Sequence, residues 1–332
     1  MAYLKDKVIL ITGGTGSLGE QIIIHILQNF HNFKHIIIFS RDEYKQHQLA
    51  NKLRNFNTFD KILFKLGNIR DLERLQKCCG GVDIIIHTAT LKHVDILENN
   101  PMEAIKTNVL GAQNLITAAQ NTQVQKVIAL STDKAASPNS IYGASKLCAE
   151  KLFISANFEF PNHKTQFSVL RCGNVFNSRG SVVEVFQKMK KTGTVTVTDL
   201  NMTRFSITHQ KLVTFIIQSL NKMIGGEIFI PKMPSYNIQT LVKAIAPNCI
   251  IKIIGKRPGE KINEDLITIH EAAHTIEFEH QFLILPMDAN QAELIKGEYK
   301  NGKMCENGFS YISDSNDYFL DIKEIEQLVN KN

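Results

Sequence analysis

The chain has 332 residues, 43% of them hydrophobic, and its 38 basic and 32 acidic side chains give a formal charge of +6. This length and apolar content suit one large domain, or a large domain joined to a smaller one. The basic excess is modest and scattered, which disfavours a nucleic-acid binder and suits the attraction of an anionic small molecule.

The cysteine pattern and the hydropathy exclude further classes. None of the six cysteines forms a CxxC pair or has zinc-finger spacing, so we expect reduced thiols and no metal site. No apolar run approaches the ~20 residues that span a bilayer. Residues 1–7 lead straight into a predicted strand and leave no room for a signal peptide. We therefore expect a cytoplasmic protein with neither nucleic acid nor membrane as partner.

Predicted strands and helices alternate along the first half of the chain. The strands lie at 8–12, 35–39, 62–66, 82–87, 124–131 and 166–171, and the helices at 21–30, 42–56, 101–122 and 142–156. This order predicts an α/β fold, a Rossmann-like doubly wound parallel sheet with helices on both faces.

The alternation breaks after about residue 175. Short strands at 194–198 and 227–230 mix there with helices at 210–223 and 238–246. We therefore predict a nucleotide-binding domain over 1–175 and a smaller mixed α/β lobe over 176–332 that binds substrate. Some segments of the second part are expected to return to the first.

A glycine-rich turn follows the first strand. Gly13, Gly16 and Gly19 form GxxGxxG between the strand and the next helix. Such a turn lets a pyrophosphate approach the backbone and rest on amide groups at a helix N-terminus. We expect this turn, with Thr15, Ser17 and Leu18, to bind a dinucleotide; the alternative is a tight turn without a ligand.

The tip of the second strand is where a Rossmann domain contacts the adenosine ribose. Ser40 and Arg41 stand there instead of an acidic residue, and a guanidinium suits a 2′-phosphate, which favours NADP over NAD. Lys45 adds charge one turn later, while Asp42 can point away and cap the next helix. Residues 68–69 (Asn68 and Ile69) follow the third strand and are expected near the adenine, with a simple loop as the alternative.

A catalytic constellation follows the fifth strand. Tyr142 and Lys146 form YxxxK, and residues i and i+4 share one helix face. A nearby ammonium lowers the pKa of a tyrosine, which would make Tyr142 a base at neutral pH. Thr132 is expected near the reacting oxygen, and Asp133 and Lys134 offer an acid and a base; the alternative is a surface ion pair.

With these residues in place, the chain resembles the inverting UDP-N-acetylglucosamine 4,6-dehydratases of bacterial pseudaminic acid synthesis. These enzymes belong to the extended short-chain dehydrogenases/reductases. The resemblance covers roughly residues 5–285. Its markers are TGGTGSLG (12–19), SRDE (40–43), HTATLKHV (87–94), STDKAASP (131–138), YGASK (142–146), RCGNVFNSRGSVV (171–183), MTRFSIT (202–208) and KRPGEK (256–261). Dehydratases that retain configuration commonly have Glu where this chain has Lys134.

The resemblance implies a reaction on UDP-GlcNAc. Tyr142 takes the proton of the sugar 4-hydroxyl while C4 gives a hydride to NADP. Lys134, if neutral, removes the C5 proton, and protonated Asp133 gives a proton to the departing 6-hydroxyl. The hydride returns to C6, and C5 is reprotonated on the opposite face. The product would be UDP-2-acetamido-2,6-dideoxy-β-L-arabino-hex-4-ulose.

The resemblance also implies positions around both ligands and a homo-oligomer, a hexamer. Thr88, Lys92 and Val175 would border the cofactor, and Lys92 and Asn174 the sugar. The remaining substrate contacts would be Ser178, Arg179, Gly180, Ser181, Val182, Val183, Thr196, Arg204, Arg257 and Glu260.

The chain departs from the family pattern at Asn68, Cys172, Ser206 and Asn263. Ser206 and Asn263 lie in the substrate half, so they leave the exact sugar more open than the cofactor. A 4-epimerase or 5-epimerase of the same fold remains an alternative, because it would use the same Tyr142 and Lys146. A non-catalytic NADP-sensing scaffold is another, although such proteins tend to lose the tyrosine or the lysine.

Overall fold

A central sheet of ten strands organises the computed structural model, which describes residues 3–159 and 163–330. Six parallel strands lie in the order β3-β2-β1-β4-β5-β6, the order of a Rossmann sheet. They are β1 (Val8–Thr12), β2 (His35–Ser40), β3 (Ile62–Leu66), β4 (Ile84–His87), β5 (Lys126–Thr132) and β6 (Gln166–Cys172). The predicted fold class is therefore confirmed.

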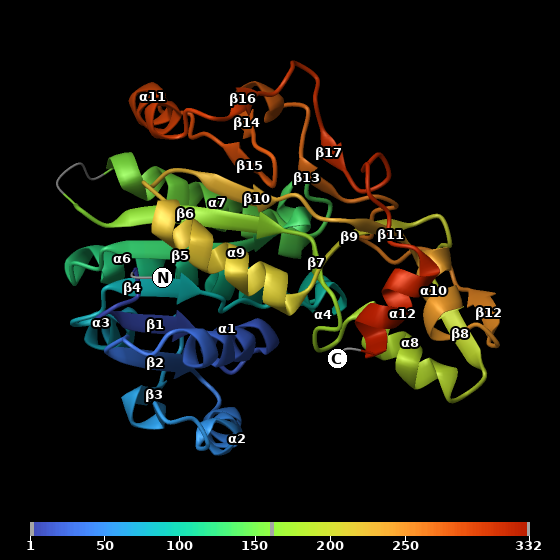
Figure 1. The fold of residues 1–332 in the computed structure, drawn as a ribbon, viewed down its shortest axis with the longest axis horizontal. Coiled ribbons are helices and arrows are strands. Elements are labelled where there is room, and N and C mark those ends of the chain that lie inside the picture. The colour runs from blue at the N-terminus through green and yellow to red at the C-terminus, as the bar shows by residue number, and fades with distance from the viewer. Residues whose placement is uncertain (1–2, 160–162, 331–332) are drawn as a thin grey trace.

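The C-terminal half extends this sheet beyond β6. β10 (Ile228–Pro231) pairs with β6 in parallel, and β15 (Gln281–Ile284) pairs with β10 in the antiparallel sense. β14 (Thr275–Glu277) and β16 (Lys303–Met304) complete the edge, and α11 (Ala289–Glu298) lies beside them (Figure 1). The chain thus returns to the large sheet after it has left it.

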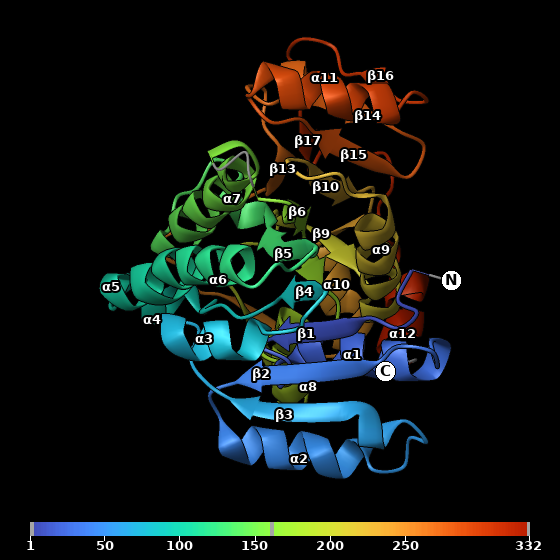
Figure 2. The same cartoon turned by 90° about the vertical axis from the view of Figure 1, so that its left-hand side faces the viewer.

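Helices cover both faces of the sheet (Figure 2). One face carries α3 (Leu72–Cys79), α6 (Leu110–Asn121) and α7 (Ile141–Glu159), and the other carries α1 (Ser17–Asn29) and α9 (His209–Lys222). α2 (Glu43–Leu53) lies beside the edge strand β3. The strands between these layers are almost wholly apolar, as expected where both faces are buried.

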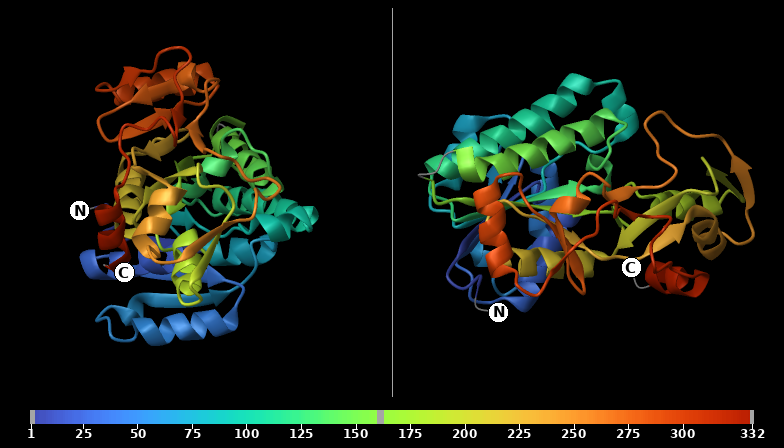
Figure 3. Two further views of the ribbon diagram at one scale, coloured as in Figure 1. Left: turned by 90° about the vertical axis from the view of Figure 1, so that its right-hand side faces the viewer. Right: turned by 90° about the horizontal axis from the view of Figure 1, so that it is seen from above.

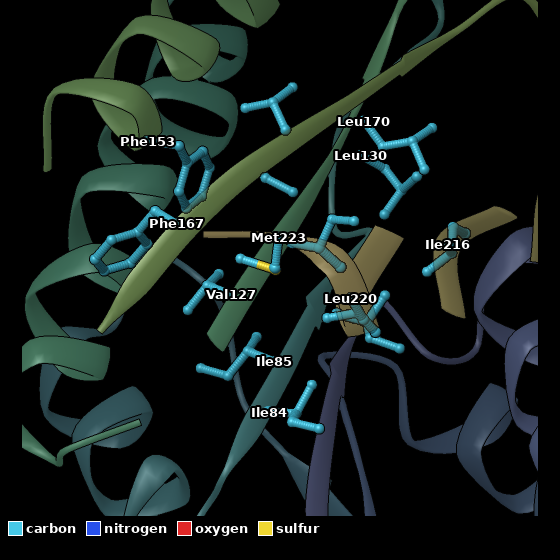
Figure 4. Packing of buried hydrophobic residues seen from close by; sticks show 14 of the residues in the cluster. Ile84, Ile85, Val127, Leu130, Phe153, Phe167, Leu170, Ile216, Leu220 and Met223 are labelled. Atoms are coloured by element: carbon cyan, nitrogen blue, oxygen red, sulfur yellow. The ribbon is translucent and has the colours of Figure 1, made fainter. Parts of the chain in front are cut away.

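The main core fills the space between sheet and helices (Figure 4). Phe153 of α7 packs against Phe167 of β6 with ring centroids 6.3 Å apart. On the opposite face, Ile216 and Leu220 of α9 are fully buried. This packing fixes the sheet rigidly, so the carboxyl ends of its strands can position side chains.

A small lobe lies beyond those carboxyl ends and has its own core (Figures 1 and 3). It contains α8 (Val182–Lys190), β8 (Thr194–Val197), α10 (Ile238–Ile245), β12 (Ile250–Ile253) and α12 (Ile322–Asn330). A three-stranded sheet of β7 (Asn174–Val175), β9 (Thr203–Ile207) and β11 (Ser235–Asn237) joins it to the main sheet. β13 (Asp265–Ile267) pairs with β17 (Tyr311–Ile312) at the junction.

Several elements differ from the sequence prediction. α1 begins at Ser17, inside the glycine turn, rather than at residue 21. The helix predicted over 101–122 comprises α5 (Pro101–Ala104), a π-helical turn (Ile105–Val109) and α6. α3, α8 and the strands after residue 260 were not predicted. Among residues 3–159 and 163–330, no helix combines the length and apolarity needed to cross a bilayer.

Candidate active site

A cavity of about 850 Å³ opens where the carboxyl ends of β1, β4, β5 and β6 face the small lobe. This is the edge of a parallel sheet at which α/β proteins bind their ligands. Most of the predicted site residues line it: Gly16, Ser17, Leu18, Gly19, Arg41, Lys45, Thr88, Lys92, Thr132, Lys134, Tyr142, Lys146, Asn174, Val175, Ser178, Arg179, Gly180, Ser181, Val182, Val183, Thr196, Arg204, Arg257 and Glu260.

The glycine turn brings the N-terminus of α1 to the cavity wall. Gly13 has φ +67°, and a Cβ there would lie 2.8 Å from the Ala89 backbone, so only glycine fits. Gly16 is the N-cap of α1, and no side chain caps that end. The exposed amide groups therefore fit a pyrophosphate, as a dinucleotide requires. Thr15 and Gly13 support the turn without lining the cavity.

The tip of β2 offers cations to the same cavity. Arg41 is exposed there, whereas the Asp42 carboxylate accepts a hydrogen bond from the Lys45 amide at 3.0 Å and caps α2. The Ser40 hydroxyl is turned inward and accepts a hydrogen bond from Gln46 at 3.0 Å. Ser40 therefore does not line the cavity, because its side chain joins β2 to α2.

Asn68 and Ile69 also lie away from the cavity wall. Asn68 Oδ1 accepts a hydrogen bond from the Arg70 amide at 3.1 Å, and Ile69 is buried against Gly111 of α6. The structure thus uses these residues to shape the loop after β3. Their predicted contact with an adenine stays a prediction.

A second helix N-terminus faces the cavity from the small lobe. Ser181 caps α8 by accepting a hydrogen bond from the Glu184 amide, and residues 180–183 line the wall. Arg179 spans from this loop to the glycine turn, where its Nη2 donates to the Thr15 carbonyl at 3.1 Å. Lys92 Nζ in turn donates to the Arg179 carbonyl at 3.3 Å. Two helix dipoles and these cations suit two diphosphates.

Tyr142 lies in the first turn of α7 and packs against Leu97 and Ala104. The next residue, Gly143, allows close contact with the preceding loop, since a Cβ there would lie 2.2 Å from the Lys134 carbonyl oxygen. This contact seats the Tyr142 phenol beside Thr132. In the sequence, the signal for this close contact was a glycine inside a pattern otherwise typical of a helix.

The expected lowering of the Tyr142 pKa is wrong for the chain alone. Burial raises the pKa of Tyr142 to about 12, and this outweighs the opposing effects of Lys134 and Thr132. Lys146 Nζ donates a 2.7 Å hydrogen bond to the Leu130 carbonyl. Burial lowers the pKa of Lys146 to about 8, although Glu150 and Cys172 favour its charged form.

Asp133 and Lys134 form an ion pair next to Tyr142, in which Asp133 is fully buried and the Lys134 side chain is 27% exposed. Lys134 Nζ lies 3.0 Å from Asp133 Oδ1 and 3.3 Å from Asn174 Oδ1, and Thr132 Oγ1 donates to Asp133 Oδ1 at 2.7 Å. Asp133 is fully buried and does not line the cavity, whereas Thr132 and Lys134 do. The alternative of a surface pair is therefore wrong.

Carboxylates keep Lys134 charged. Burial lowers the pKa of Lys134, but the carboxylates of Asp133 and Glu264 outweigh burial and hold that pKa above its usual range. The resemblance implies a lysine that is neutral before the reaction. In the chain alone, Lys134 is charged instead.

Arg204 and Arg257 differ in their surroundings. Arg204 is 6% exposed, and its guanidinium donates to the carbonyls of residues 203, 261 and 262, so its visible role is to hold the loop before β13. Arg257 is exposed and pairs with Asp95 across the cavity mouth at 3.3 Å. Glu260 accepts hydrogen bonds from Thr198 and the Arg257 amide.

Sequence reasoning missed three residues at or behind the cavity wall: His209, Tyr236 and Glu264. His209 Nε2 lies 3.3 Å from Ser17 Oγ, and Tyr236 is hydrogen-bonded to Asn174. Glu264 lies 3.5 Å from Lys134 but is 130 positions away in sequence. No local pattern marks these residues, because the lobe brings them in through tertiary contacts.

Comparison with known proteins places this arrangement in a family. The family model described as polysaccharide biosynthesis protein matches residues 9–286. The chain belongs to this family of extended short-chain dehydrogenases/reductases. A Campylobacter jejuni member of similar length, UDP-N-acetylglucosamine 4,6-dehydratase (inverting), is 45% identical over 98% of both chains.

Two further comparisons with known proteins show how widely the similarity of this chain extends. A Rickettsia bellii protein named UDP-glucose 4-epimerase is 38% identical over 98% of this chain and 95% of its own. The X-ray structure of Pen from Bacillus thuringiensis superposes with a TM-score of 0.90 at 36% identity, covering 99% of this chain and 98% of that one. The relatives of this chain thus include proteins named as a dehydratase and as an epimerase.

Proposed function

We propose that this protein is a UDP-N-acetylglucosamine 4,6-dehydratase that inverts C5. The observation that carries the proposal is the Asp133–Lys134 ion pair, 3.0 Å apart, beside the phenol of Tyr142. Oxidation at C4 needs one base, whereas removal of water across C5 and C6 needs a further acid and base. The Asp133–Lys134 pair supplies this further acid and base.

The cofactor of this reaction is NADP in the proposal. The glycine turn and the N-terminus of α1 would hold its pyrophosphate, and Arg41 and Lys45 would hold a 2′-phosphate. A nicotinamide held there would supply the hydride acceptor for oxidation at C4 and the hydride donor for reduction at C6. The second helix N-terminus, that of α8, would hold the UDP diphosphate.

The side chains have distinct proton-transfer roles in the proposal. Tyr142 takes the proton of the 4-hydroxyl, and Lys146 stabilises the resulting phenolate. Lys134 passes a proton to Asp133 along their hydrogen bond, which makes an amine base and a carboxylic acid together without changing the net charge. Lys134 then takes the C5 proton, and Asp133 supplies the proton that leaves with the 6-oxygen. Thr132 Oγ1 links Asp133 to the cavity.

A 4-epimerase is the second candidate, because the Rickettsia bellii relative has that name. It would need Tyr142 and Lys146 but not the acid–base pair. Incubation of the purified protein with UDP-GlcNAc separates the two. We expect a sugar nucleotide lighter by one water with a 4-keto group, and deuterium at C5 when the reaction runs in D₂O. Conversion to UDP-GalNAc without loss of water would contradict the proposal and favour the epimerase.

The cofactor preference gives a separate prediction. We expect Arg41→Ala to weaken NADP binding about 10- to 100-fold, because a charge-assisted hydrogen bond contributes about 1.5–3 kcal/mol. NAD binding should change little, since it has no 2′-phosphate. Titration calorimetry with both nucleotides measures the two dissociation constants, and Lys77→Ala on α3 is a control for loss of a surface cation. An equal loss of affinity for both nucleotides would mean that Arg41 does not contact the 2′-phosphate.

A further inference from the structure

Lys134 has a second carboxylate beside it. Glu264 Oε1 lies 3.5 Å from Lys134 Nζ and 3.8 Å from Arg204 Nε, and the Glu264 residue is 3% exposed. Glu264 Oε2 is buried without a hydrogen-bond partner in the described part of the chain. The Ser313 hydroxyl accepts a hydrogen bond from the Glu264 amide at 2.9 Å and fixes the backbone there. A buried carboxylate is costly unless nearby cations compensate it.

The proposed chemistry explains why one carboxylate is not enough. Asp133 must carry a proton in order to protonate the departing oxygen, so it is uncharged when the step begins. Lys134 gains a positive charge when it takes the C5 proton, before the C6–O bond breaks and while Asp133 still carries its own proton. Until Asp133 releases that proton it cannot be the counter-ion of the new ammonium, and an ammonium in a partly buried site without a counter-ion is disfavoured.

We propose that Glu264 is the permanent counter-ion of Lys134 and thereby leaves Asp133 free to carry the proton. It is a positioning residue, since it acts through Lys134, and this role rests on the proposed function. In the elimination the C5–H bond breaks and its proton forms an N–H bond on Lys134. The C5–H electron pair first passes into the enolate of the 4-keto group; it then forms the C5=C6 bond as C6–O breaks, and the Asp133 proton leaves in the water. The fixed charge of Glu264 stabilises the ammonium as it develops.

The other charged and titratable groups around this pair do not replace Glu264. Asp133, Arg204, Tyr142, Tyr236 and Cys172 face Lys134. Lys261 faces Glu264 but pairs with Asp265 at 2.9 Å. Burial raises the pKa of Glu264 above its usual range, against the opposing effects of Lys134 and Arg204. The carboxylate therefore takes up a proton at a higher pH than an exposed glutamate, and its counter-charge is lost as the pH falls through that raised value.

The test compares Glu264→Gln with wild type in water loss from UDP-GlcNAc and in deuterium uptake at C5. We expect kcat to fall about 10- to 100-fold with KM and NADP binding unchanged. The wild-type rate should also fall on the acid side as Glu264 is protonated, and the variant should lack this limb. Asp265→Asn is the matched control, because Asp265 is the next residue in the chain and its carboxylate pairs with Lys261 rather than with Lys134. This variant should keep the wild-type pH profile.

The two proposals fail in different ways. No water loss by the wild-type protein would overturn the proposed function, whereas water loss with a Glu264→Gln profile equal to wild type would overturn the role of Glu264. If Glu264→Gln does not bind NADP, Glu264→Asp decides, since it keeps the charge on a shorter side chain. A lowered kcat with the acid limb retained supports the proposal, and a wild-type kcat refutes it.

Discussion

Replacement of Lys134 by methionine should abolish water loss from UDP-GlcNAc and leave NADP binding intact. General acid–base catalysis contributes about 10²–10⁴-fold per group, and a decrease of this size is expected in the rate of water loss. Deuterium uptake at C5 should disappear as well, because no other amine lines the cavity wall beside Asn174 in the described part of the chain. Mass spectrometry of the sugar nucleotide and NMR of its C5 position measure the two effects.

The control for this variant lies on β5, the strand that leads to Lys134. Lys126→Met removes a lysine at the opposite end of β5, where Nζ donates to the Leu220 carbonyl, and it should retain full activity. Because Lys134→Met leaves the buried Asp133 without its cation, a thermal unfolding scan is needed to show that the variant is folded. Full dehydration by folded Lys134→Met protein would remove lysine from the mechanism.

The part of the cavity wall that is proposed to hold the cofactor could be predicted from local sequence. The glycine turn, Arg41 and the Tyr142–Lys146 spacing each depend on residues within a few positions of one another, and helix and strand periodicity then fixes which side chains share a face. The parallel sheet with helices on both faces follows from the regular alternation of strands and helices. These parts therefore needed no knowledge of tertiary contacts.

The acid–base cluster could be predicted only in part, because its energetics depend on burial and on distant residues. Asp133 and Lys134 are adjacent in sequence, but Glu264 reaches them from the loop before β13. The YxxxK spacing suggested a lowered Tyr142 pKa, yet the depth of Tyr142 in the fold reverses the sign. Likewise, Arg204 looked like a phosphate ligand, but its donors are occupied by backbone carbonyls of the lobe.

Tyr142→Phe should block the reaction at an earlier step than Lys134→Met does. Phenylalanine keeps the packing against Leu97 and Ala104 but has no hydroxyl to take the 4-hydroxyl proton. The C5 proton becomes acidic only after C4 is oxidised, so water loss and C5 exchange should both fall about 10²–10⁴-fold. Transfer of tritium from C4 of labelled UDP-GlcNAc to the nicotinamide of NADP separates the variants, because Lys134→Met should retain oxidation at C4 and Tyr142→Phe should not.

A second buried tyrosine provides the matched control. The Tyr311 hydroxyl accepts a hydrogen bond from the Met233 amide at 3.0 Å and donates to the Met233 carbonyl at 2.9 Å, and Tyr311 does not line the cavity. Tyr311→Phe should therefore cost about 1–3 kcal/mol of stability, because it leaves the Met233 amide unpaired, with little change in kcat. Tyr142→Phe should show the opposite pattern, since its hydroxyl contacts Thr132 at the cavity rather than the backbone of the core. Retention of C4 oxidation by Tyr142→Phe would mean that another group takes the 4-hydroxyl proton.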